Sequence, residues 1–422
     1  MSAENETSIL GTALTIDQVQ SVVNKRFGTN GKIVRWRAKE IGIQGLASAM
    51  VRVEIVWKGQ ISASLPDSVV CKIPTTHKLK QLENMQNMLK EVHKMHNCEA
   101  SVFEAFMRAK RPPTRIPFLY GVKKLPDPDN SDDEAGYIIM EDLSGKCKPL
   151  DMFSGGKMTA DQSKQVIVEL ANLHTWSLSH DVSGIEFVRI EETFEKMNDF
   201  VDSGLVELKK FIDDGVLDVD STVAGRFDEL KLAKEAYADL AIMNAAYGVP
   251  DCMCHGDVHT NNMMFHTDDH GEPTGDLAVL IDWQIVNFGN PMPDIARVFC
   301  LGVKHQNDWP ELLALYYRSF KTQLARDGKS EMPFSVRQFV ELFLRSYEVN
   351  SRNVVPMWAG LYKQIEEGKI PTNDKTKALA SIRADMKHLY VEVLDIMQDR
   401  QKWDVEIGSN VEELLRSTGD IE

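Results

Sequence analysis

The segment CMCHGDVHTNNMMF, residues 252–265, gathers two cysteines, two histidines, an aspartate and two asparagines. Thiolate and imidazole are the usual ligands of structural zinc, so the segment raises the question of a zinc site. Its spacing argues against zinc, because C-x-C differs from the C-x-x-C knuckle and Gly256 disfavours a helix that would bring two histidines to one face. The zinc alternative would draw on Cys252, Cys254, His255, His259, His266 and His270.

Oxygen-bearing side chains in and after this segment suggest a different metal. Asp257 and Asn262 are five positions apart, and the apolar run VLIDWQ, residues 279–284, carries Asp282. Magnesium prefers oxygen ligands and keeps several waters, so one carboxylate, one amide and the phosphates of a nucleotide are sufficient to hold it. The interval from Asp257 to Asn262 is also the interval between the catalytic aspartate and the magnesium-binding asparagine of kinase catalytic loops.

These motifs resemble those of a known group of enzymes. HGDVHTNN followed by LIDWQ resembles the H-G-D-x-x-x-x-N and I-D-[FW] motifs of the aminoglycoside phosphotransferase and choline kinase group. The longer run IDWQIVNFGNPMPDIARVF, residues 281–299, is similar to the ecdysteroid-kinase-like (CHK kinase-like) branch, including its nematode members. The resemblance covers roughly residues 30–400. It implies a bilobal, protein-kinase-like α+β fold, with ATP and Mg²⁺ as cofactors, Asp257 as the catalytic residue, and Asn262 and Asp282 as metal ligands.

A kinase-like lobe also needs a loop over the phosphates and a lysine that reaches them, and both have candidates upstream. EIGIQGLASAMVRV, residues 40–53, contains Gly42, Gly45 and Ser48 between two strand-like runs. Small residues there would let backbone amides approach phosphate oxygens. Lys72 lies in the short apolar run SVVCKIP, from which a lysine could reach the α and β phosphates.

The resemblance also implies a partner for Lys72 and a hinge that binds adenine. HNCEASVFEAF, residues 96–106, is similar to the family's glutamate-bearing helix, which makes Glu99 the expected ion-pair partner and Glu104 the alternative in a different register. YIIMEDLSG is similar to the segment between the lobes. We expect Met140 behind the adenine, with the backbones of Glu141 and Leu143 at its edge.

Other residues of the same motifs have structural alternatives. His255 is expected to orient the catalytic loop, and His174 to be a buried helix histidine near it. Asp294 matches a family aspartate that supports the loop, but an aspartate at the start of a helix is also favoured by the helix dipole. Trp283 and Trp358 could line an acceptor pocket, although aromatic side chains belong more often to the core.

The remaining pattern predicts an N-terminal antiparallel sheet with one key helix, followed by a mainly helical lobe. Strands are expected within residues 32–59, 68–74, 116–122 and 136–143, and a long helix within 82–110. Capping boxes, Thr15 with Gln18 and Thr159 with Gln162, mark two helix starts. After Leu143 the sequence is mainly helical, apart from a hairpin-like insert at 266–276. We place a nucleotide-binding lobe at 1–143 and a catalytic and acceptor-binding lobe at 144–422.

Composition narrows the partners. The 48 basic and 63 acidic residues give a formal charge of −15, which argues against a surface for nucleic acid. Six scattered cysteines and an N-terminus without the features of a signal peptide indicate a cytoplasmic protein with free thiols. The longest apolar runs fall short of the roughly 20 residues that span a bilayer, so membrane insertion is not expected. The pattern makes no prediction of oligomeric state.

Departures from protein kinases point to a small acceptor. His-Gly-Asp replaces His-Arg-Asp, Asp-Trp-Gln replaces Asp-Phe-Gly, and an Ala-Pro-Glu segment is missing. Without an activation segment the chain has no evident way to dock a peptide, so we expect a small hydroxylated acceptor, such as a steroid-like or xenobiotic alcohol. The helical region around 184–247 would shape its pocket. The alternatives are a choline/ethanolamine-type kinase and a catalytically silent protein that binds nucleotide or a small ligand.

Overall fold

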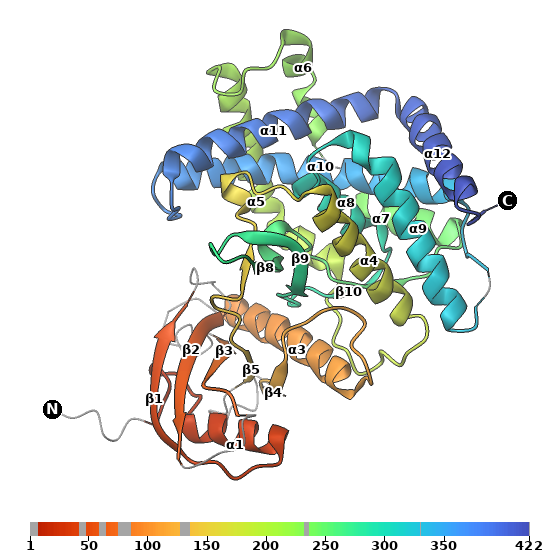
Figure 1. Ribbon diagram of the computed structural model, residues 1–422. Helices are drawn as coiled ribbons and strands as arrows, with labels where there is room; N and C mark the ends of the chain where they lie inside the picture. Colours follow the sequence, from red (N-terminus) through yellow and green to blue (C-terminus); the bar gives the residue numbers. More distant parts are fainter. Residues whose placement is uncertain are drawn as a thin grey trace. The chain divides into compact units, whose positions relative to one another are not determined.

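The computed structural model describes residues 7–41, 48–58, 65–74, 86–126, 136–231, 236–329 and 331–421. Within these residues the chain divides into two compact units. The first consists of Met1–Lys146, Val182–Val188 and Ile281–Val286, and the second of Cys147–Asp181, Arg189–Leu280 and Asn287–Glu422. Each unit therefore contains segments that are far apart in the sequence. Figure 1 draws them with the same element labels as the text.

The first unit is built on a five-stranded sheet of order β1-β2-β3-β5-β4, in which every neighbouring pair is antiparallel. This confirms the predicted antiparallel sheet. Among the described residues, the helices α1 and α3 accompany it. The helix α1 has the predicted capping box and ends at Gly28, which adopts the left-handed conformation with φ 64°. The elements are α1 Ile16–Phe27, β1 Ile33–Glu40, β2 Ser48–Trp57, β3 Ser68–Pro74, α3 Gln86–Arg108, β4 Leu119–Lys123 and β5 Tyr137–Glu141.

The alternation of side chains along each strand determines which of them pack against α1 and which lie on the opposite face of the sheet. Successive side chains of a strand point to opposite faces. Val69, Cys71 and Ile73 of β3 join the buried core formed with α1, so Lys72 between them points to the other face. The helix α3 meets Lys72 there through Glu99, and four apolar residues of α3 are buried: Val92, Val102, Phe103 and Phe106.

The second unit is mainly helical, as predicted, with short strands in two small antiparallel sheets of order β6-β8-β9 and β10-β7. The strands β8 and β9 form the predicted hairpin. These strands are β6 Cys147–Pro149, β7 Cys252–Cys254, β8 Met263–Thr267, β9 Pro273–Leu280 and β10 Asn287–Gly289.

The helices of this unit pack around α10, which contacts α5, α7, α8, α11 and α12. The α5 contact is very close, because a Cβ atom on Gly204 would lie 2.1 Å from the carbonyl oxygen of Pro356. The helices are α4 Ala160–Trp176, α5 Ile190–Asp213, α6 Ser221–Gly225, α7 Ala236–Ala246, α8 Met292–Leu301, α9 Trp309–Arg326, α10 Val336–Glu366, α11 Lys375–Gln398 and α12 Arg400–Ser417, with short 3-10 turns η2 Met152–Ser154, η3 Phe227–Leu230, η4 Thr260–Asn262 and η5 Gln306–Asp308.

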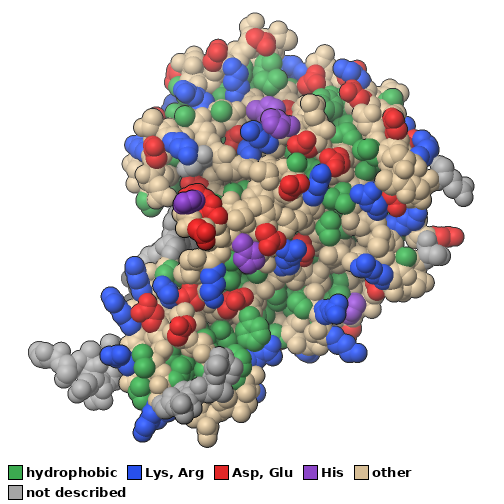
Figure 2. All heavy atoms as spheres, in the orientation of Figure 1, with side chains coloured by type: hydrophobic (Ala, Val, Ile, Leu, Met, Phe, Trp, Pro, Cys, Tyr) green, Lys and Arg blue, Asp and Glu red, His purple; other side chains and the backbone are tan. Residues whose placement is uncertain are grey.

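Two surface properties relate to the expected partners. On the face drawn in Figure 2, acidic and basic side chains are interspersed rather than separated into a basic face. Among the described residues, we find no helix with the length and apolar character needed to cross a membrane.

Candidate active site

The first unit holds a buried lysine between two carboxylates. Lys72 Nζ lies 2.6 Å from Glu99 Oε2 and 2.9 Å from Asp282 Oδ1. Lys72 and Glu99 are both buried, with 7% and 2% of their surface exposed. The ion pair expected for Lys72 is thus present with Glu99, and Glu104 does not replace it. Three segments far apart in the sequence meet at this cluster.

The charges of the cluster support one another. Burial lowers the pKa of Lys72, but the carboxylates of Asp282 and Glu99 outweigh burial and raise this pKa above its ordinary value, so the ammonium stays charged. Burial raises the pKa of Glu99, and Lys72 opposes that rise. Glu99 Oε1 also accepts a hydrogen bond of 3.2 Å from the backbone N–H of Trp283. Glu99 therefore connects the lysine strand to the segment that carries Asp282.

Asp282 has an unusual backbone. Its φ is 67°, a left-handed conformation that aspartate tolerates better than most residues and that often occurs at functional sites. The following residue, Trp283, is fully buried and packs edge-on against Phe106 with ring centroids 5.2 Å apart. Trp283 thus anchors the turn, while the Asp282 side chain keeps 39% of its surface exposed. Trp283 belongs to the core of the first unit.

The second unit carries the loop with Asp257 and Asn262. The loop follows β7, turns at Gly256 with φ 84°, and enters β8 through the turn η4. The Asn262 side-chain amide donates a hydrogen bond of 3.0 Å to the Asp257 carbonyl, which closes the loop. The Asp257 N–H donates to His255 Nδ1 over 3.3 Å. His255 therefore supports the loop from inside, as expected.

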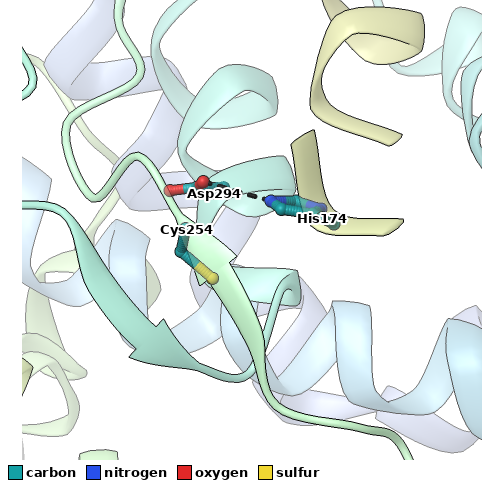
Figure 3. A group of neighbouring side chains, drawn as sticks. All are labelled: His174, Cys254 and Asp294. Atoms are coloured by element: carbon teal, nitrogen blue, oxygen red, sulfur yellow. Dashed lines mark hydrogen bonds and ion pairs between the residues drawn. The ribbon is translucent and has the colours of Figure 1, made fainter. Parts of the chain in front are cut away.

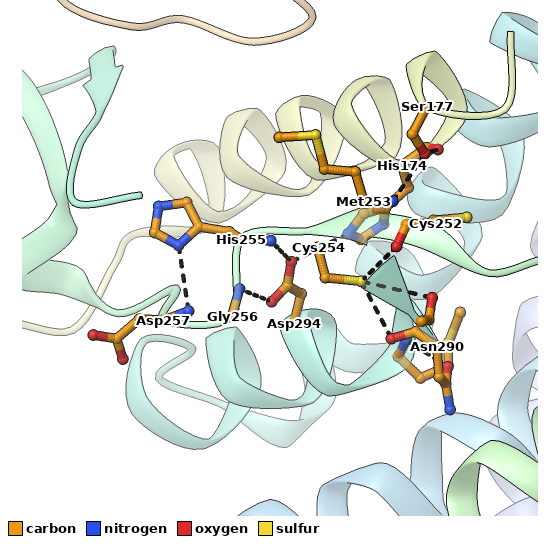
Figure 4. A network of polar contacts seen from close by, with 12 residues as sticks. His174, Ser177, Cys252, Met253, Cys254, His255, Gly256, Asp257, Asn290 and Asp294 are labelled. Carbon is orange, nitrogen blue, oxygen red and sulfur yellow. Dashed lines mark hydrogen bonds and ion pairs between the residues drawn. The ribbon is translucent and has the colours of Figure 1, made fainter. Parts of the chain in front are cut away.

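Asp294, in the first turn of α8, holds the start of the same loop (Figure 4). Its Oδ2 accepts a hydrogen bond of 2.7 Å from the His255 N–H, and its Oδ1 accepts one of 2.9 Å from the Gly256 N–H. Burial raises the pKa of Asp294, but the hydrogen bond from His174, the charges of His174 and His255, and the Gly256 N–H lower it overall. Asp294 thus lies at a helix start and supports the loop, so both readings of this residue apply.

His174, Cys254 and Asp294 form a buried group that resembles a metal site (Figure 3), since their ligand atoms lie within 4.8 Å of one another. Their hydrogen bonds argue for polar packing instead. His174 uses Nε2 on Asp294 at 3.2 Å and Nδ1 on the Tyr316 hydroxyl at 2.8 Å. Burial raises the pKa of the Cys254 thiol well above its usual value, so it stays neutral, with Sγ 3.3 Å from the Asn290 carbonyl oxygen. His174 is thus a buried helix histidine near the loop, as expected.

Two further side chains, those of Arg297 and His259, contact the carboxylate of Asp257. Neither contact was predicted from the sequence. Arg297 Nη2 lies 2.7 Å from Asp257 Oδ1, and His259 Nε2 lies 3.4 Å from Asp257 Oδ2. Burial raises the pKa of Asp257, but His259 and Arg297 outweigh burial and hold it well below the ordinary range. A signal was present, because Arg297 lies three residues after Asp294 and thus on the same helix face.

The segment expected to be the hinge is held by its neighbours. Met140 is buried in β5 opposite Val70. The Glu141 N–H donates to the Phe118 carbonyl over 2.9 Å, and its carboxylate accepts from the Phe118 N–H over 2.7 Å. The Leu143 carbonyl accepts from the Lys146 N–H over 3.0 Å. These bonds fix the backbone, while the contact with adenine stays a prediction.

Only the end of the expected phosphate loop is described. Gly42 and Gly45 lie outside the described residues, whereas Ser48 begins β2 and is buried. Its hydroxyl accepts a hydrogen bond of 3.3 Å from the Gln284 side chain. Ser48 is thus tied to the segment that carries Asp282.

A cavity of about 650 Å³ in the first unit is separate from these residues, because its lining includes none of the predicted site residues. Its lining residues are Arg35, Trp36, Arg37, Arg52, Glu54, Ile55, Val56, Asp67 and Ser68.

Trp358 was a candidate for the lining of an acceptor pocket. It lies in the second unit, is buried against Phe153 with ring centroids 6.2 Å apart, and belongs to the core.

A comparison with protein families finds one match over most of the chain. The model of the DUF1679 family, described as "Uncharacterized oxidoreductase dhs-27", matches residues 3–401. The Caenorhabditis elegans protein of that description is 23% identical over 328 residues, which are 74% of this chain and 38% of that protein. The C. elegans "Uncharacterized kinase-like protein D1044.1" is 26% identical over 215 residues, which are 49% of this chain and 51% of that protein. The chain therefore spans about two-fifths to one-half of these curated relatives.

Among solved structures, a putative aminoglycoside phosphotransferase from Ralstonia eutropha is 13% identical, with a TM-score of 0.43. The match covers 90% of this chain and 98% of that one. The word oxidoreductase describes a relative that is much longer than the match. Dinucleotide-binding folds of dehydrogenases use a parallel sheet, whereas every strand pair in the described part of this chain is antiparallel.

Proposed function

We propose that this chain, which belongs to the DUF1679 family, is an ATP-dependent small-molecule kinase, because it carries kinase-like sequence motifs and holds a buried lysine between two carboxylates. It would transfer the γ-phosphoryl group of ATP to a hydroxyl group of a small organic acceptor. The observation that carries this proposal is the buried lysine paired with Glu99 and Asp282. Burying such charges has a high desolvation cost, and a lysine held by a glutamate is the arrangement with which kinases bind nucleotide phosphates.

The first unit supplies the residues for the nucleotide. Lys72 would bind the phosphates, and Glu99 would position Lys72. Backbone amides around Gly42, Gly45 and Ser48 would cover the phosphates. The hinge residues Met140, Glu141 and Leu143 would contact the adenine.

The metal-binding role fits the donor atoms of the chain. Asn262 directs its amide nitrogen to the Asp257 carbonyl, so its Oδ1 is the atom that would face a cation. Asp282 offers a partly exposed carboxylate. Both are the hard oxygen ligands that suit Mg²⁺. The ion would neutralise charge on the transferred phosphoryl group.

Asp257 would align the acceptor hydroxyl. A carboxylate whose pKa is held far below the ordinary range is a weak base, so its main contribution is to accept a hydrogen bond and orient the oxygen for attack. The acceptor oxygen then forms the new P–O bond as the bond to the leaving ADP breaks. The hydroxyl proton passes to Asp257 late in the reaction, when bonding to phosphorus has made it acidic.

The test is the substitution Asp257→Asn, which keeps the shape and removes the charge. We expect ADP formation with an acceptor to fall by roughly 10²–10³-fold, while ATP still raises the unfolding temperature. Asp276→Asn, which changes an exposed carboxylate of β9, is the matched control and should keep full turnover. Undiminished turnover in folded Asp257→Asn would refute the assignment. ATP binding without transfer to any acceptor would instead favour a silent nucleotide-binding protein.

A further inference from the structure

The sheet face that carries Lys72 is arranged in rows of side chains, each row crossing β2, β3 and β5. One row consists of Met50, Lys72 and Ile138. The next row on this face, two residues away along each strand, consists of Arg52, Val70 and Met140. An arginine therefore stands in the same row as Met140, the residue expected behind the adenine.

The side chain of Arg52 reaches across β3 to the expected hinge. Its Nε lies 2.6 Å from Oδ2 of Asp142, the residue that directly follows β5. In the sheet, β3 lies between β2 and β5 (Figure 1), so the two ends of this ion pair start from strands roughly 10 Å apart. Val51 and Val53, on either side of Arg52, belong to the core formed with α1. The ion pair therefore crosses β3 on the opposite face, which is the face of Lys72.

Asp142 is a fixed anchor for the guanidinium. Its Oδ2 also accepts a hydrogen bond of 2.8 Å from the Ser68 hydroxyl, and its Oδ1 accepts one of 2.9 Å from the Ser144 N–H. Burial raises the pKa of Asp142, but the hydrogen bonds from Ser144 and Ser68 and the charge of Arg52 lower it overall, so the carboxylate stays ionised at neutral pH. Asp142 is the middle residue of the segment 141–143, so it holds the guanidinium beside the backbone groups that we propose to bind the base.

The guanidinium is also accessible to a ligand. The side chain of Arg52 keeps 36% of its surface exposed, although its partner Asp142 keeps only 4%. Arg52 and Ser68 line the cavity of about 650 Å³ described above, so the ion pair can be reached from the space outside the sheet. A guanidinium is planar and stacks on aromatic rings, and a nucleobase offers such a ring.

From these contacts we infer that Arg52 binds the nucleobase, with its guanidinium stacked on the ring and held in place by Asp142. This inference rests on the proposed kinase function, because it takes Lys72 as the phosphate site and Met140 as the back of the base site. The rows of Lys72 and Arg52 lie about 7 Å apart along the strands, a separation that the ribose of a nucleotide spans. Arg52 is then a residue of direct contact, and Asp142 is a positioning residue.

The test compares two ligands on the full chain. Mg-ATP carries the base, whereas Mg-tripolyphosphate has the phosphates alone. Arg52→Lys keeps a cation that can pair with Asp142 but has no planar group to stack on a base. We expect this change to raise the Kd of Mg-ATP about tenfold and to leave the Kd of Mg-tripolyphosphate within about twofold of its value in the unchanged protein. Calorimetry measures both constants, and thermal unfolding without ligand checks that the variant is folded.

Arg37→Lys is the matched control. Arg37 lies opposite Glu54 on the same face of the sheet, is exposed and lines the same cavity. It belongs to β1, two strands away from β3, so it should not reach the base. Its replacement should therefore leave the affinities for both ligands as they are in the unchanged protein.

The outcomes separate this inference from the proposed function. Equal weakening of both ligands by Arg52→Lys, or an unchanged Kd of Mg-ATP, would overturn the inference. Tighter binding of Mg-ATP to the variant would also overturn it, since the guanidinium would then block the base site. If only Mg-ATP is weakened but no acceptor consumes ATP, the inference stands and the kinase function fails. If the unchanged protein binds neither ligand, both fail.

Discussion

Three aspartates of the candidate site show how surroundings decide the role of one residue type. Asp294 accepts two backbone N–H groups and therefore acts as a support. Asp282, in a left-handed conformation, pairs with Lys72 and remains partly exposed. Asp257 contacts Arg297 and keeps a low pKa. Asp282 and Asp257 keep 39% and 26% of their side-chain surface exposed, whereas Asp294 is buried. Environments of this kind separate the tasks of chemically identical groups.

The buried pair of Lys72 and Glu99 leads to a prediction that separates stability from activity. Lys72→Met leaves Glu99 buried without its cation, and this should lower the free energy of unfolding by about 3–5 kcal/mol. The double variant Lys72→Met with Glu99→Leu removes both charges and should recover most of that loss. Urea unfolding at neutral pH measures the stability of each variant.

ADP formation should stay lost in both variants, because the lysine that we propose to bind the phosphates is absent from each. The double variant controls for a loss of activity caused by unfolding, because we expect it to be stable and still inactive. If the loss of unfolding free energy in the double variant equals the sum of the losses in Lys72→Met and Glu99→Leu, the two side chains are not coupled in the way described. If the double variant retains turnover, Lys72 has no role with the phosphates.

At the scale of elements, the sequence predicts local features best. The capping boxes of α1 and α4 and the β8–β9 hairpin are confirmed, because each depends on residues a few positions apart. The ion pair of Lys72 with Glu99 could be expected only through resemblance. The contact of Arg297 with Asp257 was missed, because it depends on how α8 packs against a loop that lies 40 residues earlier.

The contact between α10 and α11 contains a buried carboxyl group outside the candidate site. Glu392 of α11 accepts hydrogen bonds from the Tyr347 hydroxyl of α10 and from the Gln306 amide of η5. Burial raises its pKa from 4.5 to about 7. The folded protein therefore holds a proton on Glu392 in a pH range in which the unfolded chain has lost it.

This raised pKa predicts a pH dependence of stability. Because the folded state binds more protons between these two values, the contribution of Glu392 falls as pH rises from about 4.5 to about 7 and is fully lost above. Glu392→Gln, which is always neutral, should unfold like the unchanged protein at about pH 5 and be more stable by up to about 3 kcal/mol at about pH 8. Thermal unfolding across this range measures the difference.

His388, one turn before Glu392 and 3.5 Å from it, is the control for this titration. His388→Gln should keep the fall of stability with rising pH, since burial lowers the pKa of His388 and its own titration therefore acts in the opposite direction. Parallel curves for Glu392→Gln and the unchanged protein would show that Glu392 keeps an ordinary pKa.

At the scale of the whole molecule, the two units are not two consecutive stretches of sequence, because each contains segments that are far apart in the chain. The segment Ile281–Val286 leaves the β8–β9 hairpin of the second unit but packs within the first. Its anchors there are the Trp283 ring on Phe106 and the Trp283 N–H on Glu99. The polar residue beside this anchor, Asp282, is thereby delivered to the lysine strand.

This assignment of Trp283 predicts where its removal is felt. Trp283→Ala should lower stability by about 3–5 kcal/mol, because a fully buried indole is lost. Amide hydrogen exchange should accelerate first in α3 and β3, although the next elements along the chain belong to the second unit. Trp358→Ala is the matched control, since that ring is equally buried but lies in α10 against Phe153, so its loss should speed exchange in α10 and η2. Faster exchange in α10 after Trp283→Ala, with α3 still protected, would show that the segment 281–286 is held by the second unit instead.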